Sequence, residues 1–494
     1  MKFFIILLIS LTLHAADRTQ WGEKYSRNQV SDEINLPKSF DPLTGENIKW
    51  KTKLGSQTYS TPVISGGKVF IGTNNNNPRD SKHKGDRGVL FCLDEESGRL
   101  LWQLVVPKLD WDPYLDWPAE GIVSPVTVEE NRVYIVSNRG EVMCLDIEGM
   151  ANGNDGPYMD EAEHMTPKNE PSLPTGDLDA DILWLYDIRA ENGIHQHDGA
   201  HSSILLHGRY LYLNTSNGVD NTHAVIRAPD APSLIVLDKR TGTLVARDYE
   251  KIGPHIFHST WSSPALATIN GKPQIIFGGG DGICYGFKAL SVSQKDHIEA
   301  LEKIWWFDGD PSAPKENIHT YLKNRKKSPS TIQSMPVHVA GKVYLTLGGD
   351  IWWGKRQAWL KCIDATKIGD TSGSGEIWSY ALNRHCCATP AVADDLVFVG
   401  DCGETVHCVD AATGKPYWTH ELAGDIWASA LVADGKVYLG SRRGEFLIFR
   451  VSKEKELLFS IKLDSEINAS PVAANGVLYV ATMKYLYAIE SVGK

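Results

Sequence analysis

Three aspartates placed after strand-like stretches are the residues best suited to acid–base chemistry. Asp281 follows the run Gly278 to Gly280, while Asp350 and Asp401 each follow an apolar stretch that ends in Gly. A positioned carboxylate can take a proton from a substrate as a general base. The same oxygens suit a hard cation such as Ca²⁺. These three residues are therefore candidate catalytic residues and candidate metal ligands.

A second group combines flat aromatic rings, guanidinium groups and thiols. Indole faces and guanidinium groups can together hold a planar, anionic ligand. Two adjacent cysteines can close a strained disulfide ring, and the nearby thiol of Cys402 could exchange with it. For the cysteines, the alternative to a disulfide is free, packed thiols. For the ligand site, the alternative is a polar channel mouth that holds only water. The candidate ligand-binding residues are Trp261, Arg384, His385, Cys386, Cys387, Trp427, Arg442 and Arg443.

Histidines cluster in two short stretches, residues 194–201 and 255–258. Two histidines two residues apart on an extended loop can share a metal ion, and His197 and His201 could do so on a helix. Local hydrogen bonding of loop histidines is the alternative. His195 and His197 are candidate metal ligands on this basis.

A repeat along the chain must position all of these residues. Residues 401–422, DCGETVHCVDAATGKPYWTHEL, read as short strands separated by tight turns. Similar units recur, and the uninterrupted spacing of about 40 residues is that of a four-stranded propeller blade. The fourth strand of a unit ends in Trp, at Trp102, Trp184, Trp306, Trp378 and Trp418. The pattern predicts an all-β, eight-bladed β-propeller of four-stranded antiparallel blades over residues 48–490.

The last unit is incomplete. It stops after three strands at Ile489, and a matching Trp strand stands at Ile48 to Thr52. We expect this N-terminal strand to complete the eighth blade, which would leave no open edge strand in the ring.

The long insertions fall mainly in two kinds of connection. One kind joins the second and third strands of a blade, and the other joins the fourth strand to the next blade. Both should emerge on one face of the ring, where a scaffold usually builds its site. The alternative is that the insertions accumulated without a function, because this rim of the propeller tolerates longer loops. The residues just before the first strands should ring the channel mouth on that face: His201, Trp261, Gln333, Cys386, Cys387, Trp427 and Asn468.

Five of the eight cysteines occupy one predicted position on the third strand of a blade: Cys92, Cys144, Cys284, Cys362 and Cys408. Equivalent positions of different blades stand too far apart for a disulfide, which needs Cα atoms within about 7 Å. We therefore expect these five cysteines to be small buried hydrophobic residues.

Composition and the N-terminal sequence narrow the class of protein further. The net charge of −11 and the absence of a large basic cluster argue against nucleic-acid binding. Residues 1–16 read as a signal peptide whose apolar run is too short to span a membrane. A lead-in of little pattern, residues 17–47, follows. The mature protein is expected to be periplasmic or secreted, with the signal peptide cleaved.

The unit Cys408-Val409-Asp410-Ala411-Ala412-Thr413-Gly414-Lys415-Pro416-Tyr417-Trp418 resembles the repeat of the pyrroloquinoline quinone (PQQ) propellers. Quinoprotein alcohol dehydrogenases of this kind use PQQ with Ca²⁺, a catalytic Asp and a disulfide between adjacent cysteines. BamB-like propellers carry no cofactor and bind protein partners. The chain looks most like the secreted PQQ-binding-like repeat proteins, which as a class have no assigned reaction.

Two functions follow from the residues and the resemblance. The first is a secreted binding or scaffold protein that holds a protein partner or a small ligand on its loop-rich channel face. The second is a PQQ- and Ca²⁺-dependent oxidoreductase of the alcohol or sugar dehydrogenase type. Its quinone would stack on Trp261 or Trp427 against Cys386 and Cys387, and its electrons would pass to a separate cytochrome c.

Overall fold

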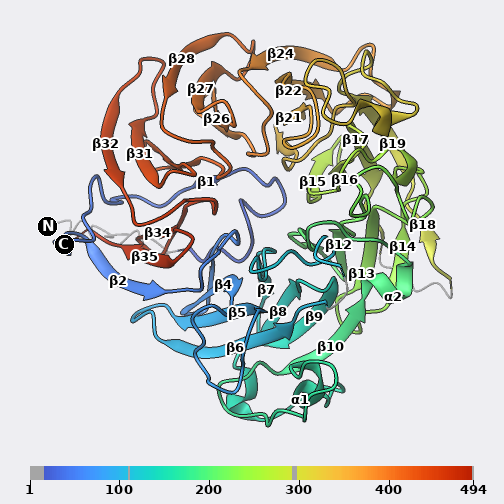
Figure 1. Ribbon diagram of the computed structural model, residues 1–494. Coiled ribbons are helices and arrows are strands. Elements are labelled where there is room, and N and C mark those ends of the chain that lie inside the picture. The colour runs from blue at the N-terminus through green and yellow to red at the C-terminus, as the bar shows by residue number, and fades with distance from the viewer. Residues whose placement is uncertain (1–15, 110–111, 292–296, 492–494) are drawn as a thin grey trace, which may run out of the picture.

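The computed structural model describes residues 16–109, 112–291 and 297–491, and these residues form eight antiparallel sheets arranged as a ring (Figure 1). The predicted eight-bladed propeller is confirmed. Apart from Ala16, the predicted signal peptide lies outside the described residues. Among the described residues, no helix is both long enough and apolar enough to cross a membrane.

The first four blades follow one another along the chain. Blade one contains β3 (Val63–Ser65), β4 (Lys68–Asn74), β5 (Arg87–Asp94) and β6 (Leu100–Pro107). Blade two contains β7 (Thr127–Glu129), β8 (Arg132–Val136), β9 (Glu141–Asp146) and β10 (Ile182–Asp187). Blade three contains β11 (Leu205–His207), β12 (Tyr210–Asn214), β13 (Leu234–Asp238) and β14 (Leu244–Arg247), with β18 (Glu299–Ala300) added in parallel. Blade four contains β15 (Ala265–Ile269), β16 (Lys272–Gly278), β17 (Ile283–Lys288) and β19 (Lys303–Asp308), with β23 (Gly369–Asp370) added in parallel.

The remaining blades complete the ring. Blade five contains β20 (Val337–Val339), β21 (Lys342–Gly348), β22 (Ala358–Asp364) and β24 (Glu376–Leu382). Blade six contains β25 (Ala391–Ala393), β26 (Leu396–Asp401), β27 (Thr405–Asp410) and β28 (Pro416–Glu421). Blade seven contains β29 (Leu431–Ala433), β30 (Lys436–Gly440), β31 (Glu445–Arg450) and β32 (Leu457–Lys462), with β1 (Val30–Ser31) added in parallel. Blade eight contains β33 (Val472–Ala474), β34 (Val477–Ala481), β35 (Tyr485–Ile489) and β2 (Ile48–Lys53).

Helical structure in the described residues is confined to short turns in the connections. The α-helical segments are α1 (Glu161–His164) and α2 (Ile188–Asn192), and the 3₁₀ segments are η1 (Gly149–Asn152), η2 (Gly253–His255) and η3 (Ile318–Tyr321).

The N-terminal strand closes the ring as predicted. Strand β2 pairs antiparallel with β35 in blade eight, and Trp50 of β2 donates its indole N–H to the carbonyl of Glu95 in blade one at 2.9 Å. Trp102, Trp184, Trp378 and Trp418 make the same kind of bond to the blade that follows theirs. The fourth-strand Trp therefore fastens each of these blades to its neighbour as well as filling its core.

Blade four departs from the predicted register. In most blades the core Trp pairs with a residue of the third strand, and a β-bulge follows that residue. Examples are the Cys92–Trp102 and Cys408–Trp418 pairs. In blade four the corresponding pair is Gly286 with Trp305. The core residue there is thus Trp305 rather than the predicted Trp306, and Cys284 lies two residues before the shared cysteine position. Two adjacent Trp residues and a Gly at the expected cysteine position concealed the shift.

The Thr-Gly turn of the repeat has a steric reason. Gly414 has a φ of +69°, and a Cβ atom at this position would lie 2.5 Å from the ring of Trp378 in the preceding blade. Glycine provides both the left-handed backbone and the space for the indole. The motif therefore encodes contact between blades, which explains why Thr-Gly and Trp recur together.

The lead-in segment covers one end of the channel, which the sequence did not indicate. Main-chain hydrogen bonds join it to the innermost strands of several blades, from the pairing of Arg18 with Ile64 to the β1–β29 pairing. Its acidic side chains also reach the hairpin turns between first and second strands, since Asp17 accepts from the N–H of Gly66 and Glu33 from that of Gly476. These turns lie at the end of the blades opposite the long insertions. Among the described residues, the lead-in therefore covers the end of the channel opposite the insertion-bearing face.

Candidate functional site

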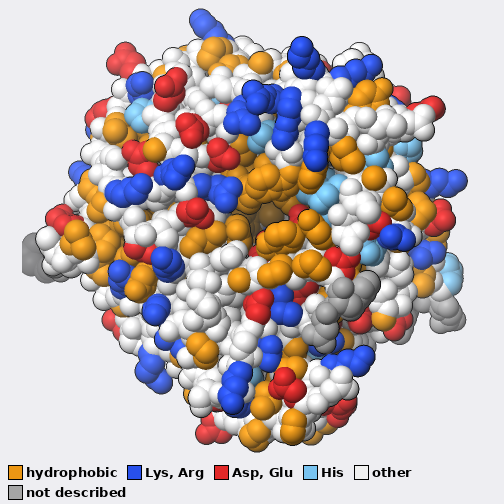
Figure 2. All heavy atoms as spheres, viewed as in Figure 1, with side chains coloured by type: hydrophobic (Ala, Val, Ile, Leu, Met, Phe, Trp, Pro, Cys, Tyr) orange, Lys and Arg blue, Asp and Glu red, His pale blue; other side chains and the backbone are white. Residues whose placement is uncertain are grey.

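The long connections surround a cavity at the open end of the channel, which we call the channel pocket. Its volume is about 690 Å³, and Figure 2 shows hydrophobic side chains gathered around a hollow at the axis of the ring. The connections supply most of its aromatic wall: Tyr59, Tyr114, Trp117, Trp352, Trp353 and Trp427.

The lead-in segment lines the inner end of this pocket with Trp21. Arg27 holds the segment in place: its fully buried guanidinium donates to the carbonyls of Trp21, Ser203 and Pro264 and to the hydroxyl of Ser203 at 2.9–3.1 Å. Burial lowers the pKa of Arg27 to about 9. Because these acceptors belong to the lead-in and to blades three and four, one side chain joins all three parts.

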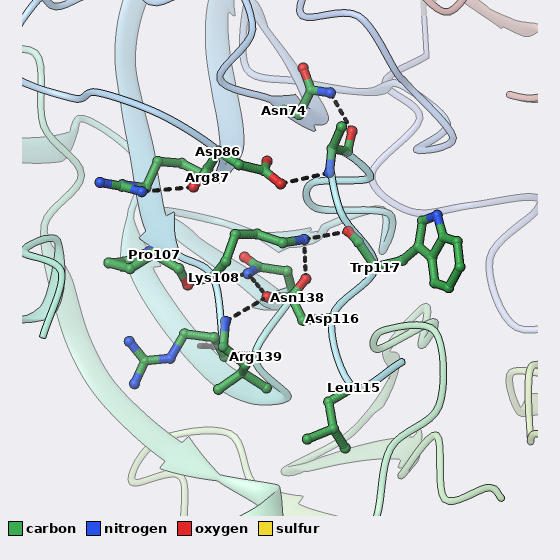
Figure 3. Close-up of polar contacts among 12 residues, drawn as sticks. Asn74, Asp86, Arg87, Pro107, Lys108, Leu115, Asp116, Trp117, Asn138 and Arg139 are labelled. Carbon is green, nitrogen blue, oxygen red and sulfur yellow. Dashed lines mark hydrogen bonds and ion pairs between the residues drawn. The ribbon is translucent and has the colours of Figure 1, made fainter. Parts of the chain in front are cut away.

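The connection between β6 and β7 is anchored before it reaches the pocket (Figure 3). Asp116 pairs with Lys108 and accepts a hydrogen bond from the side-chain amide of Asn138 at 2.7 Å. Ala119 donates its N–H to Asp86 at 2.6 Å. These contacts fix the connection to blades one and two. Tyr114, Trp117 and Glu120 of this fixed connection line the pocket.

Acidic side chains and a guanidinium both line the pocket. Burial and the neighbouring Asp198 raise the pKa of Glu120, and burial raises the pKa of Asp198 to about 6. The guanidinium of Arg442 lies 4.1 Å from the centre of the Trp427 ring. Stacking of this kind leaves the N–H groups at the edge of the guanidinium available to an anionic ligand.

Three buried histidines meet beside the acidic groups. His197, His223 and His258 each have a ligand-capable atom, and these atoms lie within 4.8 Å of one another. Burial lowers the pKa of His197 to about 2 and that of His223 to about 4. Burial alone would lower the pKa of His258, but the negative charge of Asp350, the hydrogen bond to its carboxylate and the charge of Asp198 together raise it.

The three predicted aspartates lie in different surroundings. Asp350 is fully buried behind the histidines, where it accepts from His258 at 3.0 Å and from the backbone N–H groups of Trp352 and Trp353. Asp281 accepts from the hydroxyl of Tyr285 at 2.6 Å, and Asp401 accepts from His407 at 3.0 Å. None of the three aspartates lines the channel pocket itself.

The cysteine group divides between the pocket and the protein core. All eight cysteines are free thiols, and Cys387 alone is not fully buried. Cys387 lines the pocket, while Cys386 packs in the hydrophobic core between blades five and six and donates to the carbonyl of Gly400 at 3.1 Å. The thiol of Cys402 is hydrogen-bonded to Cys387, which raises its pKa together with burial. The third-strand cysteines are buried and free, as expected.

Position relative to the first strand decides which predicted residues reach the pocket. Of the residues predicted just before a first strand, Cys386 does not line the pocket, whereas the others do: His201, Trp261, Gln333, Cys387, Trp427 and Asn468. Of the candidates placed after a second strand, Arg442 lines the pocket and Arg443 does not. A second strand lies about 4.8 Å farther from the axis than the first. Arg384, His385 and His195 also lie outside the pocket lining, and the backbone N–H of His195 is held by Asn217.

Several pocket residues were not predicted from the sequence. Trp21, Tyr114, Glu120 and His223 lie in segments that carry no repeat pattern. The one available signal was the density of aromatic residues within the insertions, where Trp352 and Trp353 stand side by side.

Comparisons with known proteins agree with this architecture. A family model described as "Outer membrane protein assembly factor BamB" matches residues 86–151 and 357–454. The crystal structure of BamB from Moraxella catarrhalis superposes with a TM-score of 0.53 at 12% identity, covering 90% of this chain and 99% of that one. The chain has the fold of the PQQ-like propellers.

A quinoprotein is also similar. The quinohemoprotein alcohol dehydrogenase of Comamonas testosteroni is 29% identical over 115 residues, which cover 21% of this chain and 16% of that protein. Its crystal structure superposes with a TM-score of 0.50 at 13% identity, covering 97% of this chain and 81% of that one. At this level of identity the structural likeness establishes the fold alone.

The residues present do not match the PQQ and Ca²⁺ site that this likeness implies. Arg442 on Trp427 suits a quinone carboxylate, but Glu120 and Asp198 place further carboxylates in the same pocket. Cys386 is in the core, and Asp281 and Asp401 are hydrogen-bonded within their own blades. The pocket as it stands therefore does not fit PQQ with Ca²⁺.

Proposed function

We propose that the protein binds a small molecule in the channel pocket. The observation that carries the proposal is the shape of this cavity, which is closed at its inner end by the lead-in segment and walled by aromatic rings. Its volume of about 690 Å³ lies within the range of about 300–1,000 Å³ typical of small-molecule sites.

The polar groups favour a planar ligand that carries an anionic end. Among the described residues that line the pocket, one side chain is a Lys or Arg, namely Arg442. Its Nε has no hydrogen-bond partner among the described residues. The indole N–H groups of Trp261 and Trp427 are likewise buried without a described partner. Buried donors of this kind are costly unless a ligand accepts from them. Aromatic walls supply the apolar surface for the body of such a ligand.

Ligand binding can be tested with planar aromatic carboxylates and sulfonates, PQQ with Ca²⁺ among them. Binding would be followed by thermal shift and by quenching of Trp fluorescence. We expect saturable binding to one site that Arg442→Met weakens about 10-fold or more, because a charge-assisted hydrogen bond is lost. Arg443→Met is the matched control, since Arg443 is adjacent in sequence but lies outside the pocket lining.

Each result bears on a different function. Binding lost in Arg442→Met and kept in Arg443→Met supports the proposal. No saturable binding across the panel overturns it and leaves the protein-partner function. Reduction of a dye with alcohols or sugars in the presence of PQQ and Ca²⁺ would instead favour the quinoprotein oxidoreductase, with a cytochrome c as electron acceptor.

A periplasmic or secreted location belongs to the same proposal. It is supported by the signal-peptide pattern of residues 1–16 and by the match to a family described as an outer membrane protein assembly factor. N-terminal sequencing of the protein from culture medium or periplasm tests it. An N-terminus near Asp17 is expected, and an intact Met1 on protein confined to the cytoplasm would overturn this location.

A further inference from the structure

The three histidines at the pocket wall come from separate connections of neighbouring blades. His197 lies between β10 and β11, His223 lies between β12 and β13, and His258 lies between β14 and β15. Their ligand-capable atoms are nevertheless within 4.8 Å of one another, and all three residues are buried. Convergence of this kind cannot follow from local hydrogen bonding within one loop.

Each ring presents a nitrogen with no hydrogen-bond partner among the described residues. These atoms are Nε2 of His197, Nδ1 of His223 and Nε2 of His258. Leaving a buried polar atom without a partner costs about 1–3 kcal/mol for each group. A shared metal ion would provide a partner for all three at once.

The opposite nitrogens of two rings are held as they are in metal sites. Nδ1 of His197 donates to the carbonyl of Val219 at 2.7 Å, and Nδ1 of His258 donates to the carboxylate of Asp350 at 3.0 Å. Asp350 is in turn fixed by the backbone N–H groups of Trp352 and Trp353 and by the side-chain amide of Gln333. Such outer partners fix the tautomer and aim the Nε2 lone pair.

A carboxylate lies beside two of the three histidines. Oδ1 of Asp198 lies 3.6 Å from Nε2 of His197, and Oδ2 lies 3.8 Å from Nε2 of His258. Three imidazole nitrogens and one carboxylate oxygen suit a borderline transition metal rather than Ca²⁺ or Mg²⁺, which prefer oxygen donors throughout. A metal about 2.0–2.1 Å from each nitrogen would draw the rings slightly together.

We propose that His197, His223 and His258, with Asp198 as the fourth donor, bind one divalent transition metal ion, for which Zn²⁺ is the best match. Because His223, His258 and Asp198 also line the channel pocket, the ion faces the cavity. An oxygen of a small ligand can reach it there by displacing Asp198 or by adding a fifth bond. The site would act as a Lewis acid toward a carboxylate, hydroxyl or carbonyl group of that ligand.

Metal binding is measured on the full-length mature protein, without any organic ligand, so the result is independent of the proposed function. The protein is stripped with chelator and titrated with Zn²⁺ by calorimetry, and Co²⁺ is added separately to obtain its visible absorption spectrum. We expect one equivalent of Zn²⁺ to bind and the Co²⁺ spectrum to show nitrogen and oxygen ligands in a site of low coordination number.

The variants His223→Gln and His258→Gln are each expected to weaken Zn²⁺ binding about 100-fold or more and to abolish the Co²⁺ spectrum, because each removes an imidazole that binds the metal directly. His195→Gln is the matched control: His195 lies two residues from His197 but outside the cluster. Circular dichroism and thermal melting confirm that each variant is folded. His223→Gln is the safer of the two, because His258 donates a hydrogen bond to the buried Asp350 and its replacement would also leave that carboxylate without this donor.

The proposal is overturned if stripped wild-type protein binds no Zn²⁺ or Co²⁺. It is also overturned if folded His223→Gln and His258→Gln bind as tightly as wild type, or if His195→Gln loses binding to the same extent as these two variants.

Discussion

Asp350 in the connection between β21 and β22 accepts a hydrogen bond of 3.0 Å from Nδ1 of His258, which precedes β15 in the neighbouring blade. This pair joins blade five to blade four at the level of the channel pocket. Asp401 and His407 form a second buried Asp–His pair, also at 3.0 Å, but within blade six and outside the pocket lining. The same chemical pair thus occurs once between blades at the pocket and once within a single blade.

Replacement of Asp350 by Asn tests what this pairing does. Asp350→Asn is expected to weaken Zn²⁺ binding about 10–100-fold, because an outer-shell carboxylate raises the basicity of its histidine and fixes its orientation. Asp401→Asn should leave Zn²⁺ affinity unchanged. Calorimetry on both variants provides the comparison, and equal affinities for the two would assign Asp350 a purely structural role.

Arg27 should be among the most sensitive positions for stability. Arg27→Met removes the donor for four acceptor atoms, so we expect the free energy of unfolding to fall by about 2–4 kcal/mol. Urea denaturation measures this loss. Lys38→Met, an exposed substitution in the same lead-in segment, is expected to leave the denaturation midpoint unchanged. An unchanged midpoint for Arg27→Met would show that the lead-in is not docked in the channel.

Cys387 should react first with thiol reagents in the native protein. It is the one cysteine that is not fully buried, whereas burial raises the pKa of Cys386 well above its ordinary value. A rapid phase of one thiol is expected with iodoacetamide, and Cys387→Ser should remove it while Cys92→Ala retains it. Unfolded, unreduced protein should titrate eight thiols. A lower count would reveal a disulfide and contradict the structure.

Asp281 should make stability depend on pH in a specific direction. Burial raises its pKa in the folded protein from 3.8 to about 6, so between these values the folded state binds more protons than the unfolded state. Stability is therefore greater at low pH and falls as pH rises from about 4 to about 6. Above pH 6 the full cost of burying the carboxylate is present, up to about 3 kcal/mol.

The variant Asp281→Asn should abolish this contribution. Its free energy of unfolding, relative to wild type, is expected to increase between pH 4 and pH 6 and then to remain level. Urea denaturation at several pH values measures the difference. A difference that does not change with pH would mean that Asp281 is not buried as the structure places it.

The local pattern of the chain was sufficient for the fold. Alternating apolar residues, the Thr-Gly turn and the recurring Trp are short-range signals, and each blade is a local unit that packs on its neighbours. The pairing of β2 with β35 could be predicted for the same reason, because an incomplete eighth unit needs one strand and Trp50 offers it. In blade four the predicted register was wrong by one residue, because nothing in the sequence favours Trp305 over Trp306 as the core residue.

The site depended on contacts that no repeat encodes. His201, Trp261 and Trp427 could be placed because each stands next to a first strand, whose distance from the axis is set by the fold. His223, Glu120 and Trp21 could not, since insertions and the lead-in have no period from which their paths could be read. In the sequence, His197, His223 and His258 are separate loop residues with no shared pattern. Only the folded chain shows that they lie together in one buried cluster. Residue types and spacing determined the ring, and the packing of its irregular connections decided what the ring encloses.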